Sequence, residues 1–213
     1  MSRPDTGTPD LLRGGRMPRS ARRKQLLAAA QEVFVANGYH LAAMDDIAER
    51  AGVSKPVLYQ HFPGKLDLYL ALLDTQTELL ARTVQEALDQ TTDNRERIHG
   101  VLSAYFGFVD REGHDGAFRL IFETDLGNEP AVRARVDAVA EKTMRAVADT
   151  VAADTGLDQS RAQLLATALT GAAQVAARWW LDRDRPVTQR EAVALLESLL
   201  WRGISNFPRL DDA

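Results

Sequence analysis

The sequence predicts an all-α fold of about nine helices, with a small helical head followed by a larger helical body. Apolar residues recur every three or four positions through most of the chain, which is the period of an amphipathic helix. The breaks between these periodic segments contain glycine, proline or asparagine. No segment has the alternating pattern of a strand, so the prediction is entirely helical.

Residues 19–65, the head, are predicted to contain three helices. The first covers about residues 22–37, the second about 44–52 and the third about 54–62. Each carries apolar side chains three or four positions apart and ends at a glycine or a Pro-Gly pair. The preceding residues 1–18 are rich in proline and glycine, so we expect a flexible basic arm there.

Residues 66–213, the body, are predicted to consist of longer helices. The first of them begins at the end of the head and carries leucines along one stripe, so it should connect the head with the rest of the body. The helices are expected at about residues 65–88, 95–111, 116–126, 130–154, 159–184 and 189–206. With 213 residues, of which 45% are hydrophobic, the chain is long enough to bury a core among them.

Charge is distributed unevenly along the sequence. Residues 11–65 contain nine lysines and arginines against four acidic residues, whereas residues 66–213 contain 16 basic against 24 acidic residues. The formal net charge of −4 therefore conceals a basic N-terminal quarter. Such a segment is typical of proteins that bind a polyanion, although a solvated surface with a basic tail would have the same composition.

The segment 44–65 has the length and the turn chemistry of a helix-turn-helix unit. Gly52 permits the left-handed backbone that ends its first helix, and Val53 fills the angle between the two helices. Ser54 is a good N-cap for the second helix, and Pro56 lies in the first turn, where a missing amide hydrogen is harmless. The pattern predicts that this second helix enters the major groove of DNA.

Side chains of this second helix that lie off the buried stripe of Leu58 and Phe62 are free to contact DNA. Gln60 is suited to an adenine edge and Val57 to a thymine methyl group, while Lys65 and the other basic or hydroxyl side chains suit phosphate oxygens. The candidate DNA-binding residues are Arg22, Ser54, Lys55, Val57, Tyr59, Gln60, His61 and Lys65. The alternative is a generic helical corner whose polar residues are merely exposed.

Residues 22–72 resemble the DNA-binding segment of the TetR family of bacterial transcriptional regulators. The resemblance rests on the runs Gly38-Tyr39, Asp46-Ile47-Ala48, Ala51-Gly52-Val53-Ser54, Leu58-Tyr59 and His61-Phe62-Pro63-Gly64-Lys65. It implies a three-helix DNA-binding domain at residues 19–65. It also implies that residues 66–213 bind a small-molecule effector and pair with a second subunit.

The sequence departs from the family pattern in two places. Ala42-Ala43 stands where relatives often carry threonine or serine, so a helix cap and a phosphate-contacting hydroxyl are absent, and Asp45-Asp46 partly offsets the lost cap through the helix dipole. Pro56-Val57 replaces a small residue followed by threonine, so the operator preference is not transferable. The run 54–65 also resembles an actinobacterial subgroup that includes regulators of fatty-acid synthesis responding to long-chain acyl-CoA.

The resemblance implies an effector site and a dimer interface in the body. The candidate effector-binding residues are Phe106, Phe118, Phe122, Met144 and Trp179. Aromatic and apolar walls suit a small hydrophobic effector such as a fatty acyl-CoA, although such residues at helical spacing are also common in a plain core. The candidate dimer residues are Leu169, Ala172, Ala176, Leu196, Leu199 and Leu200. The alternative for the alanine-rich segment is a helix buried within one chain.

The composition excludes several kinds of catalytic and metal site. The chain has no cysteine, so disulfides, thiolate metal sites and a cysteine nucleophile are ruled out. We also find no phosphate-binding loop, dinucleotide fingerprint or serine-nucleophile motif, and therefore expect no enzyme activity and no cofactor. The four histidines are scattered; a metal held by His99 or His114 with Glu123 or Asp125 is a weak alternative. No apolar run is long enough to span a membrane and no signal peptide is recognisable, so we expect a cytoplasmic protein without a membrane partner.

These residues support two functions from different classes. In the first, the protein is a homodimeric, ligand-responsive transcription factor, a repressor by default, that binds a near-palindromic operator in double-stranded DNA. In the second, it is a helical small-molecule carrier or interaction module without specific DNA binding. Preference for its own upstream region over random DNA at physiological salt distinguishes the first from the second.

Overall fold

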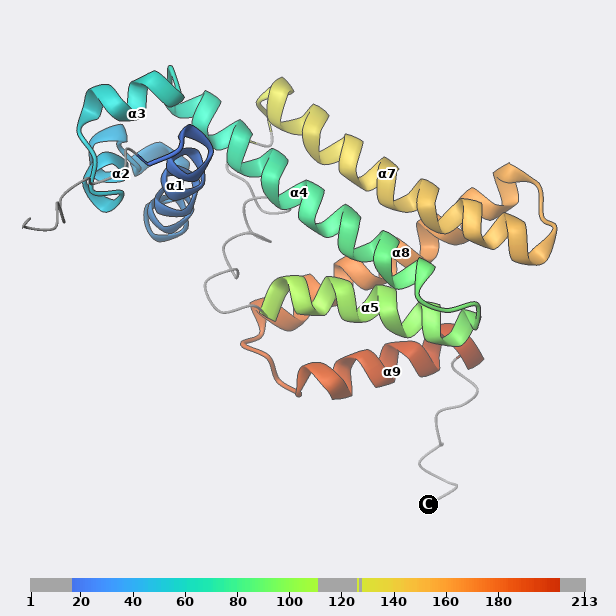
Figure 1. Ribbon diagram of the computed structural model, residues 1–213. Helices are drawn as coiled ribbons and strands as arrows, with labels where there is room; N and C mark the ends of the chain where they lie inside the picture. Colours follow the sequence, from blue (N-terminus) through green and yellow to red (C-terminus); the bar gives the residue numbers. More distant parts are fainter. Residues whose placement is uncertain (1–16, 111–125, 127, 204–213) are drawn as a thin grey trace, which may run out of the picture.

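The computed structural model describes residues 17–110, 126 and 128–203, and within these residues it contains eight helices and no strand (Figure 1). The helices are α1 (Arg19–Leu41), α2 (Met44–Arg50), α3 (Lys55–His61), α4 (Lys65–Asp89), α5 (Asn94–Asp110), α7 (Pro130–Thr155), α8 (Gln159–Asp182) and α9 (Gln189–Arg202). The all-α prediction is therefore confirmed. The helix expected at 116–126 lies outside the described residues, apart from Leu126.

Helices α1 to α3 form the head around a small apolar core. Its most deeply buried side chains are Leu26, Phe34, Ile47, Leu58 and Phe62. Helix α1 differs from the prediction, because it begins at Arg19 and continues past the expected stop to Leu41. The expected break is present as a kink at Gly38, whose φ of 69° is accessible to glycine at little cost.

Helix α4 connects the head with the body. It leaves the head at Lys65 and runs into the body, where it packs against α5 and α7 (Figure 1). The predicted stripe is confirmed in the later part of the helix, where Leu80, Val84 and Leu88 are almost fully buried. In its first part the predicted Leu66 and Leu70 are only half-buried, and Leu68 and Leu72 are buried instead. The same helix therefore contributes to the core of the head and to that of the body.

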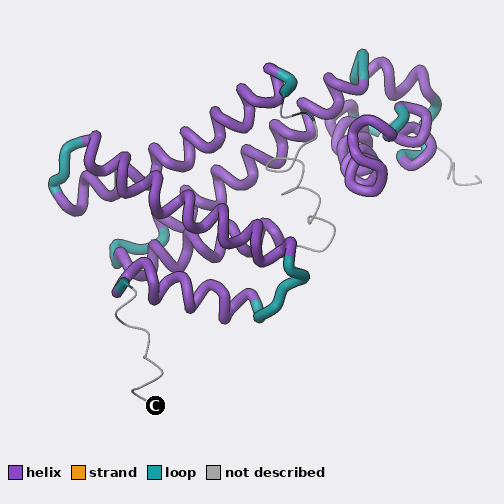
Figure 2. Tube along the Cα trace, turned by 180° about the vertical axis from the view of Figure 1, so that it is seen from behind, coloured by secondary structure: helices purple, strands orange, loops and turns teal. Residues whose placement is uncertain are grey.

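The body is built from α4, α5, α7, α8 and α9, packed on one another in antiparallel and crossing pairs (Figure 2). Helix α8 buries a row of alanines, and these small side chains let neighbouring backbones approach closely. At its end, the Trp180 Nε1 donates to the Val187 carbonyl oxygen at 2.8 Å, which fixes the turn into α9. None of the helices among the described residues is long and apolar enough to cross a lipid bilayer.

Candidate nucleic-acid interface and ligand cavity

The turn between α2 and α3 has the geometry that the sequence predicted, except at the cap. Gly52 adopts a φ of 63°, and the Val53 amide donates to the Ala48 carbonyl oxygen at 3.0 Å. Ser54 occupies the N-cap position, and its carbonyl oxygen accepts from the Val57 amide at 3.0 Å. Its side chain, however, makes no capping hydrogen bond, so the predicted cap is wrong in that detail. Ser54 is an exposed residue.

Helix α3 buries one face and exposes the other. Leu58 is fully buried, whereas the Tyr59 side chain is 47% exposed and that of Gln60 is also exposed. Val57 and His61 are half-buried at the edge of the exposed face. A major groove about 12 Å wide admits an α-helix, so the exposed face of this seven-residue helix can enter it.

Two acidic residues of α2 bind polar groups of the head. The Lys55 ammonium pairs with the Asp45 carboxylate, and both side chains are more than half exposed. Hydrogen bonding to that carboxylate raises the pKa of Lys55. The Asp46 carboxylate accepts from the Ala43 amide at 3.4 Å, which partly replaces the cap that Ala43 does not supply. The chain therefore uses its acidic pair for local contacts.

A basic cluster at the start of α1 adjoins the end of α3. Arg19, Arg22, Val57, Gln60 and His61 line a shallow hollow on this side of the head. Arg22 donates from its Nη1 to Gln25 at 2.8 Å, so its side chain is oriented along α1. Burial lowers the pKa of His61, and the positive charges of Arg19, Arg23 and Arg22 lower it further. The sequence prediction included Arg22 but missed Arg19, which faces the same hollow.

Lys65 is placed differently from the expectation that it contacts phosphate. Its Nζ donates to the carbonyl oxygens of Tyr39 at 2.8 Å, His40 at 3.2 Å and Ala42 at 2.9 Å. An ammonium group has three N–H donors, so these backbone acceptors use all of them. In this structure Lys65 therefore holds the end of α1 and has no donor left for a phosphate oxygen.

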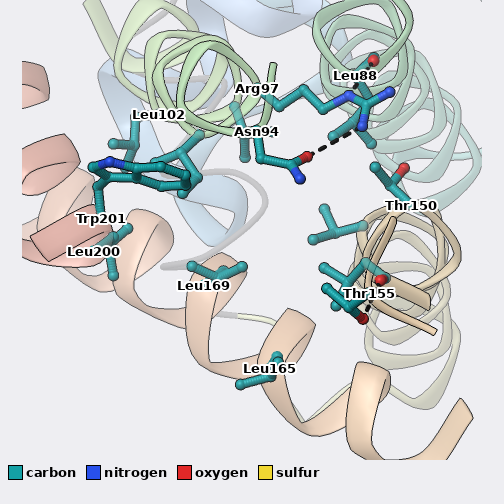
Figure 3. A pocket seen from close by; sticks show the side chains of 14 residues that line it. Leu88, Asn94, Arg97, Leu102, Thr150, Thr155, Leu165, Leu169, Leu200 and Trp201 are labelled. Atoms are coloured by element: carbon teal, nitrogen blue, oxygen red, sulfur yellow. Dashed lines mark hydrogen bonds between the residues drawn. The ribbon is translucent and has the colours of Figure 1, made fainter. Parts of the chain in front are cut away.

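The body contains a cavity of about 240 Å³ (Figure 3). It lies between the end of α4, the start of α5, the end of α7 and parts of α8 and α9. The lining residues are Leu88, Asn94, Arg97, Ile98, Val101, Leu102, Val147, Thr150, Val151, Thr155, Leu165, Leu169, Leu200 and Trp201. Most of these side chains are aliphatic, so the cavity suits an apolar ligand.

Arg97 is the charged residue of the cavity wall, and its donors are directed into the protein. Its Nε donates to the carbonyl oxygens of Leu88 at 3.1 Å and Thr91 at 2.8 Å, and its Nη1 donates to Asn94 at 3.1 Å. The same guanidinium group pairs with the Asp154 carboxylate at the end of α7. Figure 3 shows Arg97 and Asn94 on one side of the cavity, with Leu165 and Leu169 on the other.

None of the predicted effector residues that the structure describes lines this cavity. Phe106 is buried in the core, where its ring lies 5.4 Å from that of Trp180. Met144 is half-buried, and the Trp179 side chain is 55% exposed on α8. Phe118 and Phe122 lie outside the described residues. The aromatic residues of the body did not indicate this cavity, because its walls are mainly leucine, valine and isoleucine from the ends of helices.

The predicted dimer residues lie on α8 and α9, and they differ in exposure. Leu199 is exposed, whereas Leu169, Ala172, Ala176, Leu196 and Leu200 are half-buried. Leu169 and Leu200 also line the cavity. More strongly exposed apolar side chains on α8, which the prediction did not name, are Leu164 and Val175. These belong to a stretch of α8, residues 162–177, that contains no charged residue.

His99, one of the two histidines weighed for a metal site, forms a hydrogen bond with Glu197 on the surface of the body. Its Nδ1 lies 2.9 Å from a carboxylate oxygen of Glu197 on α9, and Arg95 donates to the other oxygen at 2.6 Å. The hydrogen bond from His99 is the main reason why the pKa of Glu197 is lowered. The other residues weighed for that metal, His114, Glu123 and Asp125, lie outside the described residues.

Two family models match the chain in the same order as its two parts. Residues 26–72 match the model of bacterial regulatory proteins of the tetR family, and residues 94–203 match the tetracyclin repressor-like C-terminal domain. The chain belongs to the TetR family. The first match covers the helix-turn-helix of the head, and the second covers all the helices that line the cavity except α4.

Similar proteins of this family include a curated relative and solved structures. The chain is 47% identical over 196 residues to the HTH-type transcriptional activator FasR of Mycolicibacterium smegmatis, covering 92% of this chain and 89% of that protein. A TetR-like transcriptional regulator from Rhodococcus sp. RHA1 has a TM-score of 0.68 at 30% identity, covering 90% of this chain and all of the other. FadR from Bacillus subtilis in complex with stearoyl-CoA has a TM-score of 0.70 at 20% identity, covering 85% and 98%, and shows the same fold. These relatives are transcriptional regulators and not enzymes.

Proposed function

We propose that this TetR-family regulator binds a near-palindromic operator as a homodimer and changes its operator affinity when a small hydrophobic effector occupies the cavity. The observation that carries this proposal is the course of α4. Its first residue, Lys65, is fastened to α1 within the head, and Leu88 near its end lines the cavity. A single helix thus joins the two sites that an effector-responsive regulator must couple.

The effector is proposed to be a long-chain fatty acyl-CoA, with the acyl chain in the cavity. The aliphatic lining supports an unfunctionalised hydrocarbon chain, because such a ligand leaves no polar group without a partner. The names of two similar proteins agree with this class, since one is a fatty acid metabolism regulator protein of Bacillus subtilis and the other was solved with stearoyl-CoA. A cavity of about 240 Å³ is too small for a whole long acyl chain. In this proposal, part of the chain therefore extends past the exposed rim at Leu165 and Trp201.

Dimerisation is proposed through α8 and α9. Interfaces are depleted of charge at their centre, and the uncharged stretch 162–177 of α8 with its exposed Leu164 and Val175 fits that description. Two copies related by a two-fold axis would present two α3 helices to half-sites about one helical turn apart. Repression by default stays a prediction, and the word activator in the name of the 47% identical relative favours activation instead.

The test is a binding experiment with the wild-type protein. An operator is first selected from random DNA, and its affinity is then measured by fluorescence anisotropy with and without palmitoyl-CoA at fixed salt. We expect a palindromic sequence to be enriched and its affinity to change at least several-fold with the acyl-CoA. Failure to enrich any sequence would favour the carrier without specific DNA binding. A reporter gene behind the selected operator then decides between repression and activation.

A further inference from the structure

Asn94 is the first residue of α5 and lies in the wall of the cavity beside Arg97. An asparagine at the start of a helix often serves as its cap, but here another residue has that role. The Asp93 carboxylate accepts from the Glu96 amide at 2.9 Å and so caps the helix. The side-chain amide of Asn94 is therefore available for a different contact.

Arg97 fixes which end of this amide faces the cavity. The Arg97 Nη1 donates to the Asn94 Oδ1 at 3.1 Å, and a guanidinium group has no acceptor, so the nitrogen end of the amide cannot take that position. Arg97 itself is held by two backbone carbonyl groups and by the Asp154 carboxylate. The Asn94 Nδ2 has no acceptor among the described residues, and Figure 3 shows this nitrogen directed into the cavity.

The two hydroxyl groups of the cavity wall already have acceptors within α7. Thr150 donates to the Ala146 carbonyl oxygen at 3.0 Å, and Thr155 donates to that of Val151 at 2.6 Å. Each hydroxyl group has a single hydrogen, so neither has a donor left for a ligand. The Asn94 amide, in contrast, has both of its N–H groups to offer to an acceptor in the cavity.

We propose that Asn94 donates a hydrogen bond to the carbonyl oxygen at the head of a bound acyl chain and thereby sets the direction in which the chain enters the cavity. The inference rests on the proposed function, because it takes the cavity to be the effector site. It adds the residue that recognises the polar end of the effector. It also distinguishes an acyl chain from a plain hydrocarbon chain of the same length, which offers Asn94 no acceptor.

The exposure of Asn94 agrees with this position of the carbonyl group. In an acyl-CoA, the carbonyl group lies where the hydrocarbon chain meets the hydrated part of the molecule. Asn94 is exposed, whereas Leu88 and Val147 of the cavity wall are almost fully buried. The amide thus lies at the corresponding boundary between solvent and the apolar interior. From there the chain crosses the cavity toward Leu165 on the other side (Figure 3).

The test uses two probes that differ only at this oxygen. Palmitoyl-CoA carries the thioester carbonyl group, whereas S-hexadecyl-CoA has a methylene group in its place. The ratio of their affinities therefore cancels the contacts of the chain and of the CoA. Calorimetry on the full-length protein gives this preference for wild type and for Asn94→Leu, which removes the donors at similar side-chain size. We expect the preference for palmitoyl-CoA to fall about three- to tenfold, which is the contribution of one hydrogen bond.

A second variant and a matched control complete the comparison. Asn94→Asp keeps an oxygen for Arg97, and an acidic residue is favourable in the first turn of a helix, so this variant should fold well. It has no donor at neutral pH, and we expect the same loss of preference. Asn128→Leu is the control, because Asn128 is exposed and does not line the cavity. An unchanged preference in both Asn94 variants would overturn the proposal, as would an equal loss in the control.

Free palmitate distinguishes the two sources of such a carbonyl oxygen. If palmitate binds more tightly than palmitoyl-CoA and is weakened as much by Asn94→Leu, the proposal holds and the oxygen belongs to a free carboxylate. Wild-type protein that binds neither palmitoyl-CoA nor palmitate would overturn the proposed effector as well as this inference. Failure of this inference alone has a different signature, because the wild-type protein then binds its ligand with a preference that does not depend on Asn94.

Discussion

Arg97 on α5 and Asp154 at the end of α7 form an ion pair beside the cavity, and Arg97 also donates to the Leu88 carbonyl oxygen of α4. The Arg97 and Asp154 side chains are only 15% and 29% exposed. One guanidinium group therefore holds three helices together at the end of the body where the proposed effector binds.

Replacing Arg97 by methionine should destabilise the body. Hydrogen bonds to a charged group contribute about 1.5–3 kcal/mol each when measured by substitution, so we expect the free energy of unfolding to fall by about 2 kcal/mol. Urea denaturation measures this change. Arg161→Met is the matched control, because Arg161 pairs with Asp158 at 73% and 53% exposure and should cost about 0.5 kcal/mol or less. Equal losses for the two variants would contradict the role of Arg97.

Filling the cavity should separate effector binding from DNA binding. Val151 lines the cavity, so Val151→Phe places a larger side chain in the proposed acyl-chain site. We expect the affinity for palmitoyl-CoA, measured by calorimetry, to fall at least about tenfold, while operator affinity without effector stays unchanged. Ala140→Phe is the control, because Ala140 is exposed on the same helix and does not line the cavity. If the two variants bind palmitoyl-CoA equally well, the effector occupies another site.

Removing the charge of Asp45 should strengthen DNA binding. The Asp45 carboxylate pairs with Lys55 next to the exposed face of α3. Asp45→Asn eliminates a negative charge near the phosphates and releases the lysine, so we expect operator affinity to rise several-fold at low salt and less at high salt. Asp137→Asn, on the exposed surface of α7, is the control for net charge alone. Anisotropy titrations at two salt concentrations are sufficient, and an equal gain for both variants would argue against a local effect.

His61 should make the protein sensitive to acid. Burial and three neighbouring arginines lower its pKa in the folded protein, so above the ordinary pKa of a histidine the ring is neutral in both the folded and the unfolded chain. As pH falls below that value, the unfolded chain binds the proton more readily, and the stability contributed by neutral His61 is lost. His61→Gln should therefore lose less stability than wild type between about pH 7 and pH 5. Thermal melts across this range test the difference, and parallel curves for the two proteins would show that His61 does not contribute.

The helix-turn-helix could be predicted closely because its signals are local. Gly52, Val53 and Leu58 each have a role that depends on neighbours a few positions away, and the structure places all three as expected. The position of Lys65 could not be predicted in this way. Its partners lie 23 to 26 residues earlier, at the end of α1, where carbonyl groups lack intrahelical donors.

The cavity could not be predicted from the sequence either, because the residues that line it are distant from one another along the chain. It forms where the ends of several helices meet, so its lining residues share no motif and no common spacing. Aromatic residues were the most visible signal in the body, but Phe106 fills the core beside Trp180. The aliphatic residues that do line the cavity, such as Ile98 and Val147, have the same pattern as any buried helix face.

The length of α4 converts small movements into large ones. Its 25 residues span about 37 Å at 1.5 Å per residue. A tilt of about 5° at the cavity end would displace the opposite end by about 3 Å, which is close to the 3.4 Å rise of one base pair. A ligand that moves the cavity walls apart only slightly could therefore shift the DNA-binding head by about one base pair along the duplex.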